Sequence, residues 1–297
     1  MIFKEDTCRE VIERISSEQG FGPGQAEHMV WILDTLDVMG EVPPEDFEVF
    51  LKGGTCVQNY LPSNVQRFSK DIDLSLPVQE GFDVVESYVE ELNSHLKERS
   101  YSSFLEARPG SPGGDVICFD RFFDPEYAEE RYFGLHEGKG AWITVEFHVA
   151  EITPSFKKSK LSLLPALYGD IDVKFNCATR GKLLSDKIIA SMGPYHEARE
   201  EAKDVLDLNA MLNNDQFRRR ALEAKSLIGD YASKTGDKRR KMVKRSVHTI
   251  KNLGEEMTDE RLATHVNAIL PRDYRFEDLD SWVKFCDETI GLLESSF

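Results

Sequence analysis

Two aspartates, Asp71 and Asp73, have the residue type and spacing that most directly indicate chemistry in this sequence. They alternate with the apolar Ile72, Leu74 and Leu76, a period-two pattern that is typical of a half-buried strand. Both carboxylates therefore project from one face, with Cα atoms about 6.5–7 Å apart. Carboxylates at that spacing can converge on one or two divalent cations, as phosphoryl and nucleotidyl transfer require. Mg²⁺, or Mn²⁺ in its place, suits such a site because it takes its remaining ligands from water and phosphates.

A glycine turn, Gly53-Gly54-Thr55, precedes this strand. Glycines let the backbone approach a ligand closely, and a helix from Cys56 to Tyr60 would direct free N–H groups and its positive end at a phosphate. Thr55 would cap that helix or donate its hydroxyl to a phosphate oxygen. The alternative is an ordinary turn followed by a solvated strand face, because the glycine turn alone or the pair of aspartates alone is weak evidence of a site. The turn and the aspartates together favour a site for phosphate and metal.

Two segments carry a resemblance to the nucleotidyltransferase fold superfamily: Lys-Gly-Gly-Thr at 52–55 and Arg-Phe-Ser-Lys-Asp-Ile-Asp-Leu at 67–74. The superfamily signature is a Gly-Gly or Gly-Ser turn, a short helix and an Asp-x-Asp strand. The Arg-Phe-Ser prefix resembles in particular the AbiEii-type abortive-infection toxin family. The resemblance implies transfer of a nucleoside monophosphate from an NTP, with Arg67 and Ser69 contacting phosphate or bracing the acidic strand. The segment is neither a Walker A loop nor a dinucleotide-binding fingerprint.

A third acid, Glu146, lies on another predicted strand. Residues 141–150 alternate, with Ile143, Val145, Phe147 and Val149 on one face and Trp142, Thr144, Glu146 and His148 on the other. Nucleotidyltransferases commonly place a third acid on a neighbouring strand, so the resemblance implies that Glu146 joins Asp71 and Asp73 as a metal ligand. An ordinary glutamate on a strand face is the alternative.

Two charged residues fall on the inward faces of predicted helices. Lys187 lies within the apolar arc of the helix at 180–191, and Asp204 lies on the inward side of the next helix. An unpaired buried ammonium costs several kcal/mol, so a buried Lys187–Asp204 ion pair is one explanation. The resemblance implies another, in which Lys187 binds the triphosphate and Asp204 orients Lys187 or the nucleotide.

The family pattern that supports this second explanation is Ala-Glu-Lys followed by Arg/Lys-Asp-x-x-Asp-Leu. Ser185-Asp186-Lys187 and the run Lys203–Leu208 occupy those places, with Ser-Asp departing from Ala-Glu. The resemblance covers about residues 48–212.

Composition indicates a globular protein with unevenly placed charge. The chain has 297 residues, 40% of them hydrophobic, which suffices for one large or two moderate domains. No apolar run approaches the roughly 18 residues of a membrane span, and the first residues lack a secretory signal, so we expect a cytoplasmic protein with no membrane partner. The scattered cysteines and histidines predict neither disulfides nor a zinc site. The net charge of −16 argues against nonspecific nucleic-acid binding over the whole surface.

The pattern along the chain predicts two helices, then a region of strands with one further helix, and only helices after residue 178. Helices are expected at 7–17, 25–39 and 82–99, and strands at 71–76, 101–107, 115–123, 141–150 and 170–177. Further helices are expected at 180–191, 198–212, 215–233, 237–253, 258–269 and 278–294. We therefore predict an α+β fold. By resemblance, residues 1–178 form a polymerase-beta-like nucleotidyltransferase domain with a small mixed sheet flanked by helices, and residues 179–297 form a helical C-terminal domain.

The helix expected at 237–253 presents a basic face. Between Asp215 and Lys251, twelve Lys and Arg residues stand against four Asp and Glu, an excess of eight positive charges on an acidic chain. On a helical wheel, six basic residues of this helix lie opposite its apolar stripe: Arg240, Lys241, Lys244, Arg245, His248 and Lys251. This face indicates an RNA acceptor, such as a tRNA end, although a solvated helix surface often has the same composition.

Three functions remain open at this stage. The first is a metal-dependent nucleotidyltransferase that uses an NTP and an RNA acceptor, and the resemblance adds a cognate antitoxin protein as its partner. The second keeps the enzyme but gives it a small-molecule acceptor, as in antibiotic-modifying nucleotidyltransferases. The third is a scaffold of the same fold that binds nucleotide or a partner without turnover. The intact pair Asp71 and Asp73 weighs against the third.

Overall fold

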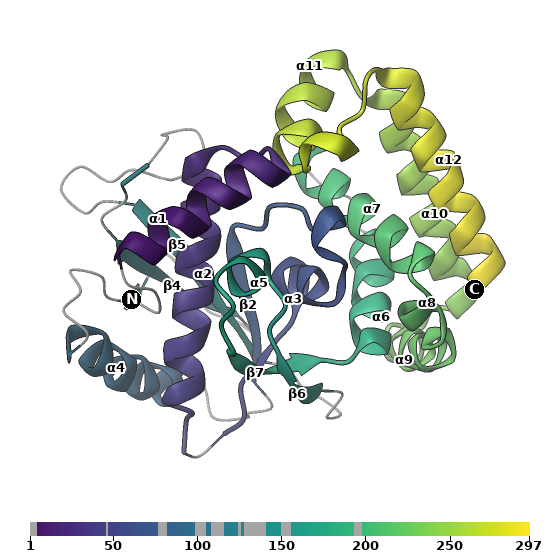
Figure 1. Ribbon diagram of the computed structural model, residues 1–297. Coiled ribbons are helices and arrows are strands. Elements are labelled where there is room, and N and C mark those ends of the chain that lie inside the picture. The colour runs from purple at the N-terminus through teal and green to yellow at the C-terminus, as the bar shows by residue number, and fades with distance from the viewer. Residues whose placement is uncertain are drawn as a thin grey trace. The chain divides into compact units, whose positions relative to one another are not determined.

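Figure 1 shows the computed structural model of the chain, which describes residues 5–45, 47–76, 82–98, 105–107, 116–123, 126–127, 141–149, 156–192 and 198–297. Its internal contacts divide the chain into two compact units. The first contains Met1–Asn59 and Phe68–Ala178, and the second contains Tyr60–Arg67 and Thr179–Phe297. The short segment Tyr60–Arg67, which the expected division assigns to the N-terminal domain, lies in the second unit.

Within the described residues, the first unit is built on a seven-stranded sheet with the order β3-β4-β5-β2-β1-β7-β6. Strand β2 pairs in parallel with β5, and β1 with β7, whereas the other pairings are antiparallel. The predicted α+β class with a mixed sheet is therefore confirmed. The strands are β1 (Phe50–Leu51), β2 (Asp71–Leu76), β3 (Leu105–Ala107), β4 (Val116–Phe123), β5 (Ala141–Val149), β6 (Phe156–Lys160) and β7 (Lys174–Ala178).

The central strands β2 and β5 separate an apolar face from a polar one. Their parallel register sets Asp73 beside Glu146, and both side chains are half-buried. Strand β4 extends the polar face with Asp120, whose carboxylate accepts a hydrogen bond from the Thr144 hydroxyl at 3.3 Å. The alternate residues of β2 and β5 form the apolar face and are fully buried: Ile72, Leu74, Ile143, Val145 and Phe147. The sheet thus presents its carboxylates on the side away from its core.

Two helices, α2 (Pro23–Glu41) and α4 (Phe82–Glu98), pack against the apolar face. The Tyr88 ring of α4 meets Phe147 of β5 edge to face, with centroids 6.4 Å apart. Arg121 of β4 projects into this core and is fully buried, because Asp34 of α2 pairs with its guanidinium at 2.6 Å. The same guanidinium donates to the Thr35 hydroxyl at 2.5 Å, so α2 supplies both of these partners.

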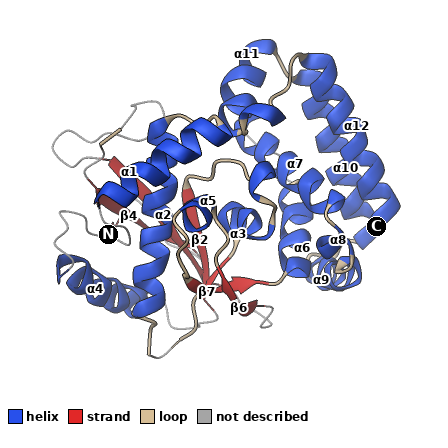
Figure 2. Cartoon of the chain, viewed as in Figure 1, coloured by secondary structure: helices blue, strands red, loops and turns tan. Residues whose placement is uncertain are grey.

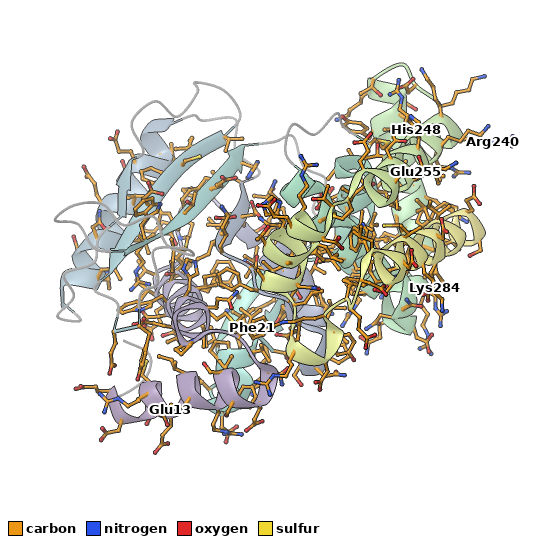
Figure 3. The ribbon with its side chains drawn as sticks, turned by 90° about the horizontal axis from the view of Figure 1, so that it is seen from above. Glu13, Phe21, Arg240, His248, Glu255 and Lys284 are labelled. Carbon is orange, nitrogen blue, oxygen red and sulfur yellow. The ribbon has the colours of Figure 1, made fainter. Side chains whose placement is uncertain are left out.

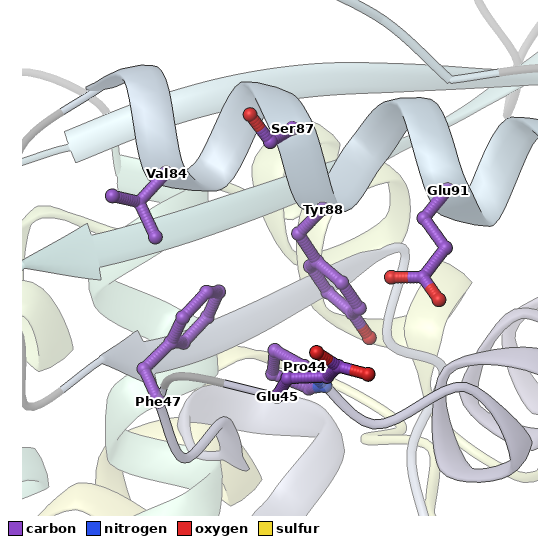
Figure 4. Close-up of a pocket in the computed structure, with 7 residues that line it drawn as sticks. All are labelled: Pro44, Glu45, Phe47, Val84, Ser87, Tyr88 and Glu91. Atoms are coloured by element: carbon purple, nitrogen blue, oxygen red, sulfur yellow. The ribbon is translucent and has the colours of Figure 1, made fainter.

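Helix α4 also lines a pocket with the segment that follows α2. The pocket has a volume of about 340 Å³, and Figure 4 shows its lining residues: Pro44, Glu45, Phe47, Val84, Ser87, Tyr88 and Glu91. The rings of Phe47 and Tyr88 meet edge to face in its wall, 5.7 Å between centroids. Because α4 covers the apolar face, this pocket lies on the side of the sheet opposite Asp73 and Glu146.

The remaining helices of the first unit are short or lie near the N-terminus. They are α1 (Glu5–Arg14) with the π-helical turn Ile15–Gln19, α3 (Gly53–Tyr60) and α5 (Leu164–Tyr168). Helix α3 begins two residues after β1 ends, so it includes Gly53, Gly54 and Thr55 as well as the range Cys56 to Tyr60 that was expected to be helical.

The second unit consists of helices and short turns in the part of the chain that the structure describes (Figure 2). The expected helix at 215–233 is divided into α8 and α9, and the one at 258–269 into α11 and two short turns, Leu262–Val266 and Asn267–Ile269. None of the helices described has the length and apolar character needed to span a bilayer. The helices are α6 (Arg180–Ala190), α7 (Ala198–Asn213), α8 (Asp215–Arg218), α9 (Ala221–Lys234), α10 (Arg239–Glu256), α11 (Asp259–Arg261) and α12 (Leu279–Ser296).

Candidate active site

Three potential metal ligands meet on the polar face of the sheet: Asp73, Glu146 and His148. One ligand atom of each lies within 4.8 Å of the others. The His148 Nε2 atom is 3.2 Å from Glu146 Oε2 and 3.7 Å from Asp73 Oδ1. The pairing of β2 with β5 explains this meeting, because Asp73 and Glu146 are direct neighbours and His148 is the next residue of β5 on the same face.

This cluster differs in one member from the metal set expected from the sequence. Asp73 and Glu146 come together as that set requires, whereas Asp71, which pairs in register with Thr144, is not part of the cluster. His148 is the third member of this cluster. The alternation of residues 141–150 already puts His148 on the face of Glu146, so a signal for it was present in the sequence.

The electrostatic setting of His148 combines opposing effects. Burial lowers its pKa, whereas hydrogen bonds to Asp73 and Glu146 raise it, and the nearby charge of Lys52 lowers it again. The net result is a pKa above the ordinary value of histidine. Lys52, which directly precedes the glycine turn, is therefore a positive charge close to this cluster, a position that the sequence pattern did not reveal.

Gly53 packs directly against the Asp73 carboxylate. A Cβ atom at this position would lie 1.8 Å from Asp73 Oδ2, so no larger residue fits without moving the carboxylate. Its φ angle of +63° lies in the left-handed region that favours glycine. The Lys52 N–H donates to the Asp73 carbonyl at 2.8 Å and fixes the turn to β2. Because α3 begins at Gly53, its first N–H groups, including that of Gly54, have no acceptor within the helix.

Thr55 and Ser69 connect the start of α3 to the start of β2. The buried Thr55 hydroxyl donates to the Asp71 carbonyl at 2.7 Å and lies 3.0 Å from the Ser69 hydroxyl. In this structure both side chains brace the acidic strand, which is one of the two roles the sequence suggested for Ser69.

A second charged cluster, the buried ion network, lies in the second unit and consists of Arg67, Lys187, Asp204 and Asp207. Lys187 Nζ is 2.6 Å from Asp204 Oδ1 and 2.8 Å from Asp207 Oδ2. Arg67 donates to both carboxylate oxygens of Asp207, at 2.8 and 2.7 Å. Two positive and two negative groups thus balance one another away from water.

Burial and pairing act against each other in this network. Burial lowers the pKa of Lys187, but the charges of Asp204 and Asp207 raise it, and the result lies above the ordinary value. Burial likewise raises the pKa of Asp207, but Arg67 and Lys187 lower it below its ordinary value. Every member for which a direction is resolved therefore favours its charged form.

Part of this network was predictable from the sequence. A Lys187–Asp204 ion pair was one of the two explanations for the inward charges and is present, whereas no role was predicted for Asp207. Asp207 instead joins both cations. Arg67, expected to contact phosphate or to brace the strand, pairs with Asp207, 140 positions further along the chain.

The basic residues of α10 are all exposed, as the helical wheel indicated: Arg240, Lys241, Lys244, Arg245, His248 and Lys251. Figure 3 shows Arg240 extending away from the helix. Asp237, just before the helix, pairs with Lys241 and with Arg245 at 2.8 Å each. Part of the positive charge of this face is therefore balanced locally.

Comparison with known proteins gives a match over most of the chain. A family model described as "Nucleotidyl transferase AbiEii toxin, Type IV TA system" matches residues 41–287. Among solved structures, the nucleotidyltransferase toxin MenT4 from Mycobacterium tuberculosis aligns with a TM-score of 0.58 and 15% identity, over 97% of this chain and 88% of that one. This likeness shows a shared fold.

A second solved structure is more distant. It is an antigenic nucleotidyltransferase-like protein from Paracoccidioides brasiliensis, with 14% identity and a TM-score of 0.37 over 85% of this chain and 97% of that one. The TM-score is too low to support an argument. No curated protein gives a significant match.

Proposed function

This chain belongs to the AbiEii family of nucleotidyltransferase toxins, and we propose that it transfers a nucleoside monophosphate from an NTP to an acceptor hydroxyl, with pyrophosphate leaving. The observation that carries the proposal is the cluster of Asp73, Glu146 and His148 beside the glycine turn that opens α3. A bond forms between the acceptor oxygen and the α-phosphorus as the bond to pyrophosphate breaks.

The donor set of this cluster fits a divalent cation. Two carboxylates and an imidazole lie within 4.8 Å of one another, and Asp71 extends the acidic face along β2. Asp73 and Glu146 would hold the ion, with Asp71 as a further carboxylate on the same face. When bound, Mg²⁺ or Mn²⁺ neutralises the phosphates and lowers the pKa of the attacking hydroxyl.

The glycine turn supplies the phosphate contacts in this proposal. The free N–H groups at the start of α3, from Gly53 and Gly54 onward, bind phosphate oxygens, because a helix N-terminus presents donors and positive potential. Lys52 adds a positive charge close by. Thr55 and Ser69 act indirectly, since their hydroxyls hold the start of β2 in place.

Lys187 is the proposed cationic contact for the triphosphate or the leaving pyrophosphate. Its raised pKa keeps it charged, and Asp204 and Asp207 hold its side chain in one position. Asp204 and Asp207 are thus positioning residues for Lys187, and Arg67 positions Asp207.

The proposed acceptor is an RNA, such as a tRNA end, that docks on the exposed basic face of α10. The exposed side chains of Arg240 and Lys244 support this docking, and the ion pairs of Asp237 involve their neighbours Lys241 and Arg245. A small-molecule acceptor is the second candidate, because a net charge of −16 opposes the approach of a polyanion. Membership in a type IV toxin–antitoxin family further supports a cognate antitoxin as the protein partner.

The reaction can be tested by incubating the full chain with each α-labelled NTP, Mg²⁺ or Mn²⁺, and total RNA. We expect transfer of label by the wild-type protein and a fall of about 1000-fold or more in Asp73→Asn, since several kcal/mol of transition-state stabilisation are lost with the metal ligand. Asp172→Asn, an exposed aspartate that pairs only loosely with Lys160 and Lys174, is the matched control and should retain the wild-type rate. Equal rates in Asp73→Asn and the wild type would disprove the assignment.

A further inference from the structure

We propose that His148 is the third protein ligand of the cation held by Asp73 and Glu146, and that it makes this site prefer Mn²⁺ to Mg²⁺. The inference rests on the proposed function, because both require a cation at this cluster. It deepens that proposal by naming the favoured ion and the side chain of this protein that selects it.

The geometry of the cluster is close to that of a coordination sphere. Two ligand atoms bound at right angles to one cation, each about 2.1 Å from it, lie about 3 Å apart. His148 Nε2 is 3.2 Å from Glu146 Oε2 and 3.7 Å from Asp73 Oδ1. Small side-chain rotations therefore bring all three atoms to bonding distance of one ion.

The backbone fixes which atoms are offered to the ion. The register of β2 and β5 places Asp73 beside Glu146, with His148 the next residue on that face of β5. Gly53 packs against Asp73 Oδ2, whereas Oδ1 is the oxygen nearer to His148. The Asp73 carboxylate is thus oriented toward the imidazole by a residue that has no room for a side chain.

The identity of the donors decides which ion is favoured. Mg²⁺ prefers oxygen ligands and gives up its water reluctantly, whereas first-row transition metals bind imidazole nitrogen well. Mn²⁺ suits carboxylate oxygen as Mg²⁺ does, but as a first-row transition ion it accepts an imidazole nitrogen more readily than Mg²⁺, although less readily than Fe²⁺ or Zn²⁺. A set of two carboxylates and one imidazole therefore gains more affinity for Mn²⁺ than for Mg²⁺ from its nitrogen ligand.

A protonated His148 would also balance the two carboxylates, with no role in binding metal. The two arrangements have opposite consequences for a variant without the imidazole. If His148 acts only as a counter-ion, its proton competes with the cation, so removal should strengthen the binding of both ions equally. If His148 is a ligand, removal should weaken Mn²⁺ binding more than Mg²⁺ binding.

The test measures metal binding to the full chain without nucleotide. Free Mn²⁺ is followed by electron paramagnetic resonance, and Mg²⁺ affinity is obtained by competition, for the wild type, His148→Gln and His148→Asp. We expect tighter binding of Mn²⁺ than of Mg²⁺ in the wild type, and a loss of about tenfold or more in Mn²⁺ affinity in His148→Gln. His148→Asp should narrow the ratio of the two affinities, because its third ligand is again oxygen. His95→Gln, an exposed histidine of α4, is the matched control and should match the wild type.

Two results would overturn the inference, and they point to different failures. An unchanged ratio of Mn²⁺ to Mg²⁺ affinity in both His148 variants would reject the ligand role while leaving the proposed reaction intact. Wild-type protein that binds neither ion better than Asp73→Asn does would reject the metal set of the proposed function itself. Circular dichroism of each variant verifies folding, and His148→Asp alone decides the question if His148→Gln does not fold.

Discussion

Gly53 shows at the scale of one residue how a backbone requirement shapes the candidate site. Its left-handed φ and its contact with Asp73 are two separate reasons for glycine, and they can be tested apart because the chain has a second glycine with only one of them. Gly236 has a φ of +71° and no atom within 4 Å of a would-be Cβ. The pair therefore separates conformational strain from steric displacement.

We predict that Gly53→Ala abolishes most nucleotidyl transfer and weakens metal binding, because the new methyl group must displace the Asp73 carboxylate. Gly236→Ala should lower the free energy of unfolding by about 1–2 kcal/mol, the cost of a left-handed non-glycine residue, and leave transfer unchanged. Urea unfolding and transfer assays on both variants provide the measurements. Normal transfer in Gly53→Ala would show that the carboxylate does not need this packing.

The sequence predicted the individual residues of this site better than their grouping. Alternation assigned Asp73, Glu146 and His148 to polar strand faces, because periodicity is a local property. Which residues of two strands become neighbours depends on register, and the pairing of β2 with β5 joins segments about 70 positions apart. Alternation put Asp71 beside Asp73 and the family resemblance added Glu146, whereas the register sets Asp73 next to Glu146 and its strand neighbour His148.

Pairs of elements are held together by buried ion pairs in both units. In the second unit the buried ion network joins Lys187 of α6 to Asp204 and Asp207 of α7, and Arg67 joins Asp207 from outside both helices. Removing one member leaves an uncompensated charge in a place with little water, which is far more costly than losing an exposed ion pair.

We predict that Asp207→Asn lowers the free energy of unfolding by about 3–5 kcal/mol at pH 7. The pKa of Asp207 is depressed, so its contribution to stability is complete above its ordinary value of 3.8 and is lost as the pH falls below it. The difference between variant and wild type should therefore shrink in acid. Urea unfolding at pH 7 and at a series of pH values down to about 2.5 measures it, with the exposed Asp215→Asn as the control that should change little at pH 7.

The raised pKa of Lys187 extends the same argument to alkaline conditions. Its contribution is complete below the ordinary lysine value of 10.5 and is lost as the pH rises above it. In acid, the difference in the free energy of unfolding between Asp207→Asn and the wild type is the decisive quantity. If it did not change with pH, the network would not consist of charged groups.

The pair Asp34–Arg121 performs the corresponding task in the first unit, where it joins α2 to β4. Asp34→Ala should destabilise the protein by about 3–5 kcal/mol, because a fully buried guanidinium loses its carboxylate. The double variant Asp34→Leu/Arg121→Met should recover most of that loss, since an apolar pair of similar volume needs no counter-charge. Thermal unfolding of the three proteins would decide it, and a double variant no more stable than Asp34→Ala would argue against the charge explanation.

Elements were predictable where their own residues are periodic. The long amphipathic helices and the strands β2, β4 and β5 have such patterns, whereas β1, with two residues, is too short to show one. Strand β6 has three lysines in five residues and lies at the edge of the sheet, where lysine keeps further strands from pairing. Its lysine-rich composition is typical of a loop and shows no strand periodicity. Its place at the edge of the sheet, which the local sequence does not reveal, makes it a strand.

Charge distribution is the property of the whole molecule that bears on the acceptor. The chain is strongly acidic, whereas positive side chains gather on one exposed face of α10. Binding of RNA there would depend on salt, since each phosphate contact releases counterions.

We predict that Arg240→Glu/Lys244→Glu weakens RNA binding and flattens its logarithmic salt dependence by about 1.5 units, at roughly 0.7–0.9 per lost phosphate contact. Affinity for free NTP should not change. Lys284→Glu, an exposed lysine of α12 (Figure 3), is the control for the loss of one positive charge elsewhere. An unaltered affinity and slope would exclude this face and favour the small-molecule acceptor.

The way the chain is divided between the two units limits how the helical unit could be moved to another protein by gene fusion. The backbone passes between them three times, after Asn59, after Arg67 and after Ala178. A single gene fusion at residue 178 would therefore deliver the C-terminal helices without Arg67, and Asp207 would arrive with only one of its two cations. A chimera that exchanges the helical unit of this protein must therefore exchange the Tyr60–Arg67 segment as well, so that Asp207 keeps both of its cations.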